Sequence, residues 1–221
     1  MRKDLRRLPL IRLPWKRKPV IQNLTGYIEK KYGSGYRLLH EGVLNSFPIR
    51  SMDRFQARNH CSLASLTGIF QYYRDRGFTG IPGDEDRVFQ DLLTHARSDF
   101  YYFPWMGTSP FFIPSLATWA WRTYGYRGKA QSLFRFKKPE ALFDTIRKEI
   151  DGDRPLIMNF VAGAYRKHTV TCMGYRSYMN GGRKLFFALV ADNWSNQVRY
   201  VDLQELGPRG FFLFSLTTIK P

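Results

Sequence analysis

The sequence lacks the features that mark several large classes of protein. Its 221 residues contain no apolar run near the ~18 residues of a membrane-spanning helix, so we expect no transmembrane segment. With only two cysteines and four scattered histidines, a disulfide scaffold and a four-thiolate zinc site are excluded, and a dedicated metal site is not expected. Internal repeats, low-complexity tracts and sequence-specific nucleic-acid motifs are also missing.

Acidic residues are scarce. Lys and Arg number 35 against 18 Asp and Glu, giving a net charge of +17. Residues 1–20 hold eight basic side chains and one acidic one, and Pro9, Pro14 and Pro19 interrupt any helix there. We expect a basic arm that is a solvated tail, a contact for an anionic surface or polymer, or a degenerate export signal. Its longest apolar run is too short for a signal peptide, which favours a cytoplasmic protein.

Residues 21–221 are expected to form one domain, because 43% of the chain is hydrophobic and its length suffices for a core. Residues 22–54 read as loops with one short helix at most. Apolar residues at helical spacing then predict four helices, the first of which has Asn59 as a candidate N-cap and Gly77 just past its end. The predicted helices span residues 61–75, 84–97, 114–124 and 139–150.

Strand-like segments dominate after Gly152. The predicted strands cover residues 155–161, 168–175, 185–191, 197–203 and 211–219. A helical half at about 55–151 followed by a sheet half at about 152–219 is typical of an α+β protein with an antiparallel sheet.

Cys61 stands at the first turn of a predicted helix. Unpaired backbone N–H groups and the positive end of the helix dipole favour a thiolate there, and the thiolate is the nucleophilic form. Cys61 is therefore a candidate nucleophile, with a small packing residue as the alternative. Cys172 lies mid-strand among apolar neighbours and is expected in the core, so we expect no disulfide between the two.

His168 opens a strand that is joined to the next one through Asn180-Gly181-Gly182, a hairpin turn signal. With the midpoint of the hairpin near residues 180–181, His168 lies opposite Asp192 or Asn193. Opposed side chains are about 5 Å apart at Cβ, so one of these two side chains would orient the imidazole. The pairing depends on register, and a bulge would shift it by one residue.

These groups make up a cysteine nucleophile system: a thiolate, an imidazole and a group that orients the imidazole. Such a system also needs donors for an oxyanion. Gln56, five residues before Cys61, is the candidate side-chain donor, and the backbone N–H of Cys61 is the second.

Several segments together resemble the C39-like branch of the papain-fold cysteine peptidases. Residues 56–65 are similar to that family's Gln…Asn-x-Cys-Gly-Pro-Ala-Ser segment, and residues 167–175 to its Gly-His-x-Val-x-x-x-Gly-Tyr strand. Residues 191–194 resemble the Asp-Pro or Asn-Pro-Trp segment that carries the third residue. Weaker similarities, at 107–126 and 139–159, follow in the family's order, so the resemblance covers about residues 55–218. It implies a papain-like fold and catalytic roles for Cys61, His168 and Asp192 or Asn193.

The chain also departs from the family pattern. Ser62 and Lys167 replace glycines, and Asn193 replaces proline. The spacing from Gln56 to Cys61 is about one residue short, which weighs against Gln56 as the oxyanion donor.

The sequence therefore predicts a thiol hydrolase that cleaves a peptide or amide bond through an acyl-thioester on Cys61, with no cofactor. One alternative is an inactive papain-fold module that binds an anionic partner through its basic surface. Another is an acyltransferase that uses the same thioester. The aromatic residues of 100–112 are either core or one wall of a substrate groove, and Trp194 either shields the Cys–His pair or simply packs. The sequence indicates neither the substrate nor the oligomeric state.

Overall fold

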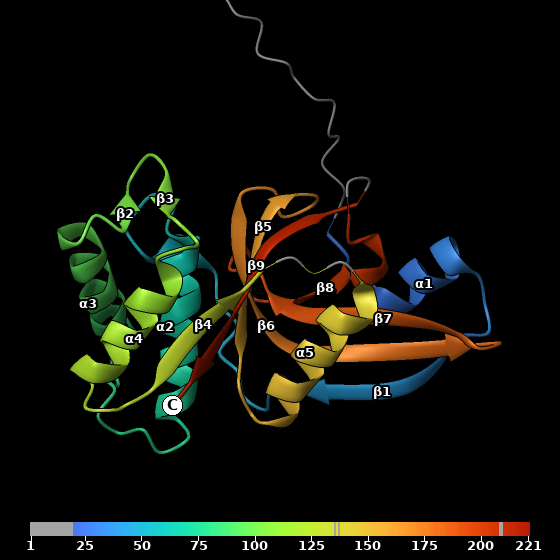
Figure 1. Cartoon of the computed structure of the whole chain (residues 1–221), viewed down its shortest axis with the longest axis horizontal. Coiled ribbons are helices and arrows are strands. Elements are labelled where there is room, and N and C mark those ends of the chain that lie inside the picture. Colours follow the sequence, from blue (N-terminus) through green and yellow to red (C-terminus); the bar gives the residue numbers. More distant parts are fainter. Residues whose placement is uncertain (1–19, 135, 137, 208–209) are drawn as a thin grey trace, which may run out of the picture.

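The computed structural model describes residues 20–134, 136, 138–207 and 210–221. Within these residues it contains five α-helices and a seven-stranded antiparallel sheet, a mixed α+β architecture (Figure 1). The basic arm predicted over residues 1–20 lies outside the described residues, apart from Val20.

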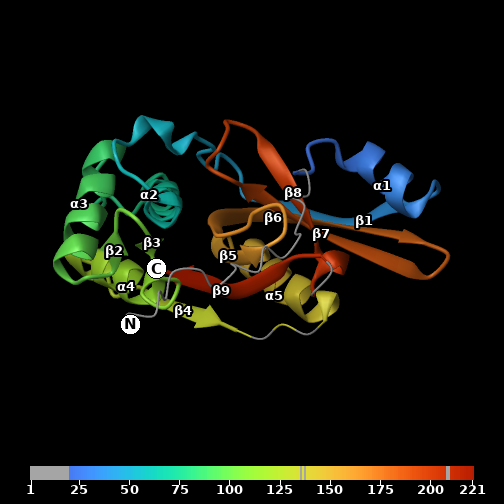
Figure 2. The same ribbon diagram turned by 90° about the horizontal axis from the view of Figure 1, so that it is seen from above.

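Three helices gather on one side of the molecule: α2 (Cys61–Arg74), α3 (Glu85–Ser98) and α4 (Ile113–Thr123) (Figures 1 and 2). These three helices and the fourth predicted helix, at residues 139–150, are all confirmed, with ends within a residue or two. In α2 nearly every residue is buried, as expected for a helix that is apolar on most of its surface. Gly77 follows α2 with φ +96°, the left-handed conformation that favours glycine after a helix.

The predicted N-cap of α2 is wrong. His60, rather than Asn59, precedes the helix, and it makes no side-chain capping hydrogen bond. Asn59 adopts φ +49° and donates its amide to the carbonyl oxygen of Pro104, 2.8 Å away. The three N–H groups at the start of α2 are therefore not capped by a preceding side chain.

The sheet has the strand order β4-β9-β5-β6-β7-β8, and β1 pairs with the far half of β6. All five predicted strands after Gly152 are present. The seven strands are β1 (Arg37–Val43), β4 (Lys129–Leu133), β5 (Leu156–Ala162), β6 (His168–Asn180), β7 (Arg183–Ala191), β8 (Val198–Asp202) and β9 (Phe212–Lys220).

Two of these strands, β1 and β4, come from outside residues 152–219. Most of β1 is exposed along an edge of the sheet, so its sequence has no clear alternation of apolar and polar residues. Helix α5 (Pro139–Asp151) packs on β6 and β7 rather than against the helical group, and α1 (Leu24–Tyr32) lies at the other end (Figure 2). Short 3₁₀ turns at Met52–Arg54 and Leu203–Glu205 and a small hairpin of β2 (Tyr102–Phe103) and β3 (Gly107–Thr108) complete the fold.

The β6–β7 hairpin turns at Gly181 and Gly182, whose φ angles are +53° and +83°. Positive φ at both central residues is the type I′ pattern, which suits the twist of a two-residue hairpin. Asn180 pairs with Arg183, and after a register shift between Cys172 and Gly174 the ladder ends at Thr171 opposite Ala191. The turn is centred slightly later than predicted, and the bulge shifts the pairing back by one residue, so the ladder continued beyond Ala191 places Trp194 opposite His168.

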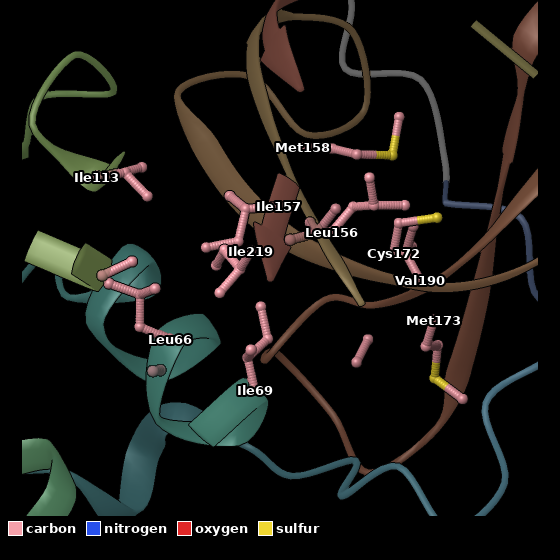
Figure 3. Packing of buried hydrophobic residues seen from close by; sticks show 14 of the residues in the cluster. Leu66, Ile69, Ile113, Leu156, Ile157, Met158, Cys172, Met173, Val190 and Ile219 are labelled. Atoms are coloured by element: carbon pink, nitrogen blue, oxygen red, sulfur yellow. The ribbon is translucent and has the colours of Figure 1, made fainter. Parts of the chain in front are cut away.

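A shared core joins the helical group to the sheet. Figure 3 shows Leu66 and Ile69 of α2 beside Ile157 of β5 and Ile219 of β9, and Cys172 deeper among the apolar residues of the sheet. A smaller cluster of Leu24, Ile28, Leu185 and Phe187 holds α1 on the hairpin. The large core packs α2 against β6, so that the first residues of both elements meet.

Candidate active site

Cys61 and His168 meet where α2 and β6 both begin. Cys61 is half-buried and His168 is buried, and both line the same cleft, where the imidazole lowers the pKa of the thiol. The two residues are more than a hundred positions apart in the chain, so packing of the helical group on the sheet creates the pair. The structure thus brings together the two residues that the sequence singled out as nucleophile and base.

Opposing effects set the pKa of Cys61. Burial raises it, because a thiolate is poorly solvated in the protein. The neighbouring imidazole of His168 and, to a smaller extent, the polar groups of Thr169 lower the pKa and outweigh burial, so it is about 7 instead of 9.0. A large fraction of Cys61 is therefore thiolate near neutral pH.

Cys172 is the opposite case. Its side chain is fully buried, and its Sγ lies 3.4 Å from the carbonyl oxygen of Gly174. Burial raises the pKa of Cys172 to about 12, so this thiol is not nucleophilic near neutral pH. The prediction that Cys172 is a core residue is confirmed, and both cysteines are free.

A backbone carbonyl orients the imidazole. Nε2 of His168 lies 2.6 Å from the carbonyl oxygen of Asp192. Because a carbonyl oxygen only accepts, Nε2 must carry the proton, which assigns the unprotonated Nδ1 of the neutral ring to the thiol. Trp194 stacks on the same ring with 4.1 Å between centroids and 21° between planes, so it covers the imidazole as one of the two sequence interpretations expected.

The prediction that a side chain of Asp192 or Asn193 orients His168 is wrong. The Asp192 carboxylate accepts from the backbone N–H of Trp194 at 3.0 Å and lies 3.7 Å from Nε of Arg199. Asn193 donates its amide to Oγ of Ser65 at 2.8 Å. The physical reason is register, because the pairing of Thr171 with Ala191, continued by three residues, places Trp194 rather than residue 192 or 193 opposite His168.

Gln56 is not part of the site. Its side chain is exposed in the segment before α2, and it does not line the cleft around Cys61. Thr108 of β3 does line this cleft, and its buried hydroxyl has no hydrogen-bond partner among the described residues. No local pattern in the sequence indicates Thr108. A hydroxyl without a partner in the wall of this cleft is a candidate donor to an oxyanion, together with the N–H of Cys61 at the start of α2.

A network of buried hydrogen bonds lies beside the Cys61–His168 pair and links the elements that carry it. The hydroxyl of Thr169 donates to Oδ1 of Asn159 at 2.7 Å and therefore accepts from the hydroxyl of Ser62, 2.9 Å away. Nδ2 of Asn159 donates to Oγ of Ser215 at 2.9 Å. The network joins the residue after Cys61 to the residue after His168 through β5 and β9, which fixes α2 relative to β6. No local pattern in the sequence indicates these contacts.

The pair opens into a cleft of about 580 Å³ between the helical group and the sheet. Trp105 and Met106, from the turn of the β2–β3 hairpin, line one side, and Phe160 and Phe214 of the sheet line another. The groove interpretation of residues 100–112 is therefore correct for part of this segment. The core interpretation is correct for Tyr102, which is buried.

Within the described residues, no group of three or more His, Cys, Asp or Glu side chains is placed to hold a metal ion. A search of the same residues for a helix long and apolar enough to cross a membrane finds none. No protein-family model matches the chain, and comparison with curated proteins gives no match.

Proposed function

We propose that the protein is a thiol hydrolase of the papain-fold type, related to the C39-like branch, that cleaves a peptide or amide bond through Cys61. The observation that carries this proposal is the Cys61–His168 pair, in which both residues line the cleft and the imidazole lowers the pKa of the thiol to about 7. A nucleophile with a lowered pKa beside a base, at the mouth of a cleft, is the arrangement that covalent catalysis needs.

Acylation follows from the geometry of the pair. The Cys61 thiolate attacks the substrate carbonyl carbon, and the C–S bond forms as the carbonyl electrons move onto oxygen. The N–H of Cys61 and the hydroxyl of Thr108 stabilise the oxyanion. The oxyanion then collapses, the C–N bond breaks and the imidazolium of His168 gives its proton to the leaving amine. Cys61 is left as an acyl-thioester and His168 as neutral imidazole.

Deacylation uses the same groups in reverse order. Nδ1 of His168 removes a proton from water as the water oxygen attacks the thioester carbonyl. Collapse of the second oxyanion breaks the C–S bond and releases a carboxylic acid, which leaves the thiolate–imidazolium pair restored. Throughout, the carbonyl of Asp192 holds Nε2 and keeps the tautomer, and Trp194 limits access of water to one face of the ring.

The binding-module alternative has weaker support. A protein that uses only its basic surface has no need of a thiol whose pKa is lowered by a neighbouring imidazole, or of a cleft that opens onto that thiol.

Acyl transfer uses the same thioester, with an amine or alcohol replacing water in the second step. Product analysis in the presence of an added amine distinguishes the two reactions.

The test compares turnover of a quenched fluorescent peptide library by the wild-type chain and by two variants. We expect Cys61→Ala to abolish turnover and to keep the wild-type circular dichroism spectrum. Cys172→Ala is the matched control, because it removes the other thiol from a position outside the cleft, and it should retain activity. Wild-type turnover in Cys61→Ala would falsify the proposal.

A further inference from the structure

The cleft around Cys61 has a chemical character that narrows the choice of substrate. Its walls carry large apolar side chains that remain open to solvent: Trp105 is 77% exposed, Met106 is 66% exposed and Val161 is 46% exposed. Single exposed apolar residues are common on protein surfaces, but several that line one cleft beside a candidate nucleophile indicate a binding surface. These side chains come from both sides of the cleft, since the first two belong to the β2–β3 turn and Val161 to β5.

The charge in the cleft is of one sign. Arg166 and Lys167 line it, both are exposed, and no Asp or Glu is among the described residues that line it. Neither cation makes an ion pair within the described part of the chain, whereas Arg54, Arg76 and Arg154 each pair with a carboxylate. Two unpaired cations beside apolar walls create a positive potential that attracts carboxylates.

Position in the chain places these charges close to the reaction. Arg166 and Lys167 directly precede His168, and Lys167 adopts φ +54°, in the tight segment between β5 and β6. A peptide lying extended across Cys61 advances about 3.3 Å per residue. A carboxylate that meets these cations is therefore within a few residues of the scissile bond.

Resting on the proposed function, we infer that the substrate is a peptide segment with an aromatic or large aliphatic residue and with glutamate or aspartate within a few residues of the cleaved bond. The apolar side chain packs against Trp105 and Met106, and the carboxylate pairs with Arg166 and Lys167. The two features complement the apolar wall and the unpaired cations, respectively.

The experiment measures binding without chemistry. The Cys61→Ala full-length chain is titrated into two fluorescently labelled short peptides, one with phenylalanine flanked by glutamates and one with glutamine in their place. We expect the glutamate peptide to bind about tenfold more tightly at low salt, since each exposed ion pair contributes up to about a fivefold effect. The preference should shrink between ~50 and ~500 mM salt as the charges are screened.

A matched pair of variants separates local recognition from the general positive charge of the protein. Arg166→Gln with Lys167→Gln should abolish the preference for glutamate. Arg127→Gln with Lys129→Gln lowers the net charge equally at exposed positions outside the cleft and should leave the preference intact. Trp105→Ala should weaken both peptides equally. Equal binding of the two peptides, or equal loss of preference in both double variants, overturns the inference.

Turnover is measured separately with the wild-type chain, so the two proposals fail in different ways. Selective binding of the glutamate peptide with no cleavage of any peptide contradicts the proposed hydrolysis but still supports an acidic peptide as the ligand. Cleavage with no preference for glutamate contradicts the inference and supports the hydrolase.

Discussion

Removing the imidazole of His168 should return Cys61 to an ordinary or weaker acid. Three influences remain on the thiol in His168→Ala. Burial raises its pKa, whereas the start of α2 and the polar groups of Thr169 lower it. Since burial is the largest single influence and the contribution of His168 is the largest that opposes it, the pKa should rise from about 7 to 9.0 or above.

The size of the effect follows from two opposing factors. At pH 7 the wild-type thiol is about half ionised, whereas a thiol with a pKa of 9.0 is about 1% ionised, a roughly 50-fold fall in thiolate. A more basic thiolate is also more nucleophilic, by about tenfold for this difference. Alkylation at pH 7 should therefore slow only about fivefold, while the midpoint of its pH profile moves from about pH 7 to about pH 9 or above.

The assay is iodoacetamide labelling at a series of pH values, with the modified cysteine identified by mass spectrometry. Wild-type Cys61 should label with a rate that rises with pH through a midpoint near 7, because the thiolate is the reactive form and its population grows as pH increases. Cys172 should label slowly throughout, because its pKa is about 12. His40→Ala, which removes an exposed histidine from β1, is the control and should not move the midpoint.

A midpoint that stays near pH 7 in His168→Ala would refute this reasoning. The start of the helix would then be sufficient to ionise Cys61, and the proposed function of His168 as its partner would lose its main support.

Three further variants test the groups around the pair. Losing a side chain that orients a catalytic histidine lowers the rate by ~10⁴-fold. Asp192→Asn should lower kcat/KM by far less, because the backbone carbonyl of Asp192 holds the ring. A loss of ~10⁴-fold would instead show that the carboxylate orients His168. The same change should lower the free energy of unfolding by about 3 kcal/mol in urea titrations, since it leaves the buried Arg199 unpaired. Asn159→Ala should cost about 2–3 kcal/mol in the same titrations, because the Thr169 hydroxyl loses its acceptor, and an unchanged midpoint would contradict the network. Thr108→Val should lower kcat about a hundredfold with little change in KM, whereas Thr108→Ser should retain activity; a fully active valine variant would exclude an oxyanion role.

Local patterns in the sequence predicted most of the secondary structure. The helical periodicity that begins at Cys61 and the glycine after it defined α2, and Gly181-Gly182 located the hairpin. Strands β1 and β4 escaped prediction because one lies mostly exposed at an edge of the sheet and the other is short and half-exposed. Whether the architecture is papain-like stays a prediction that rests on the resemblance.

Cys61 could be chosen as the candidate nucleophile from the sequence alone, because the advantage of a cysteine at the start of a helix depends on its own neighbours. The choice of His168 as its partner needed only the order of the elements and the position of the hairpin. Which atom orients the imidazole was decided by tertiary structure, because the exact register at the open end of the hairpin and the path of the chain beyond Ala191 decide what lies against His168. Tertiary structure also decided that Gln56 lies outside the cleft, that Thr108 lines it and that Asn159 joins the buried hydrogen-bond network. Each depends on contacts between segments far apart in the chain, and the packing of α2 on the sheet, rather than any periodicity, brings those segments together.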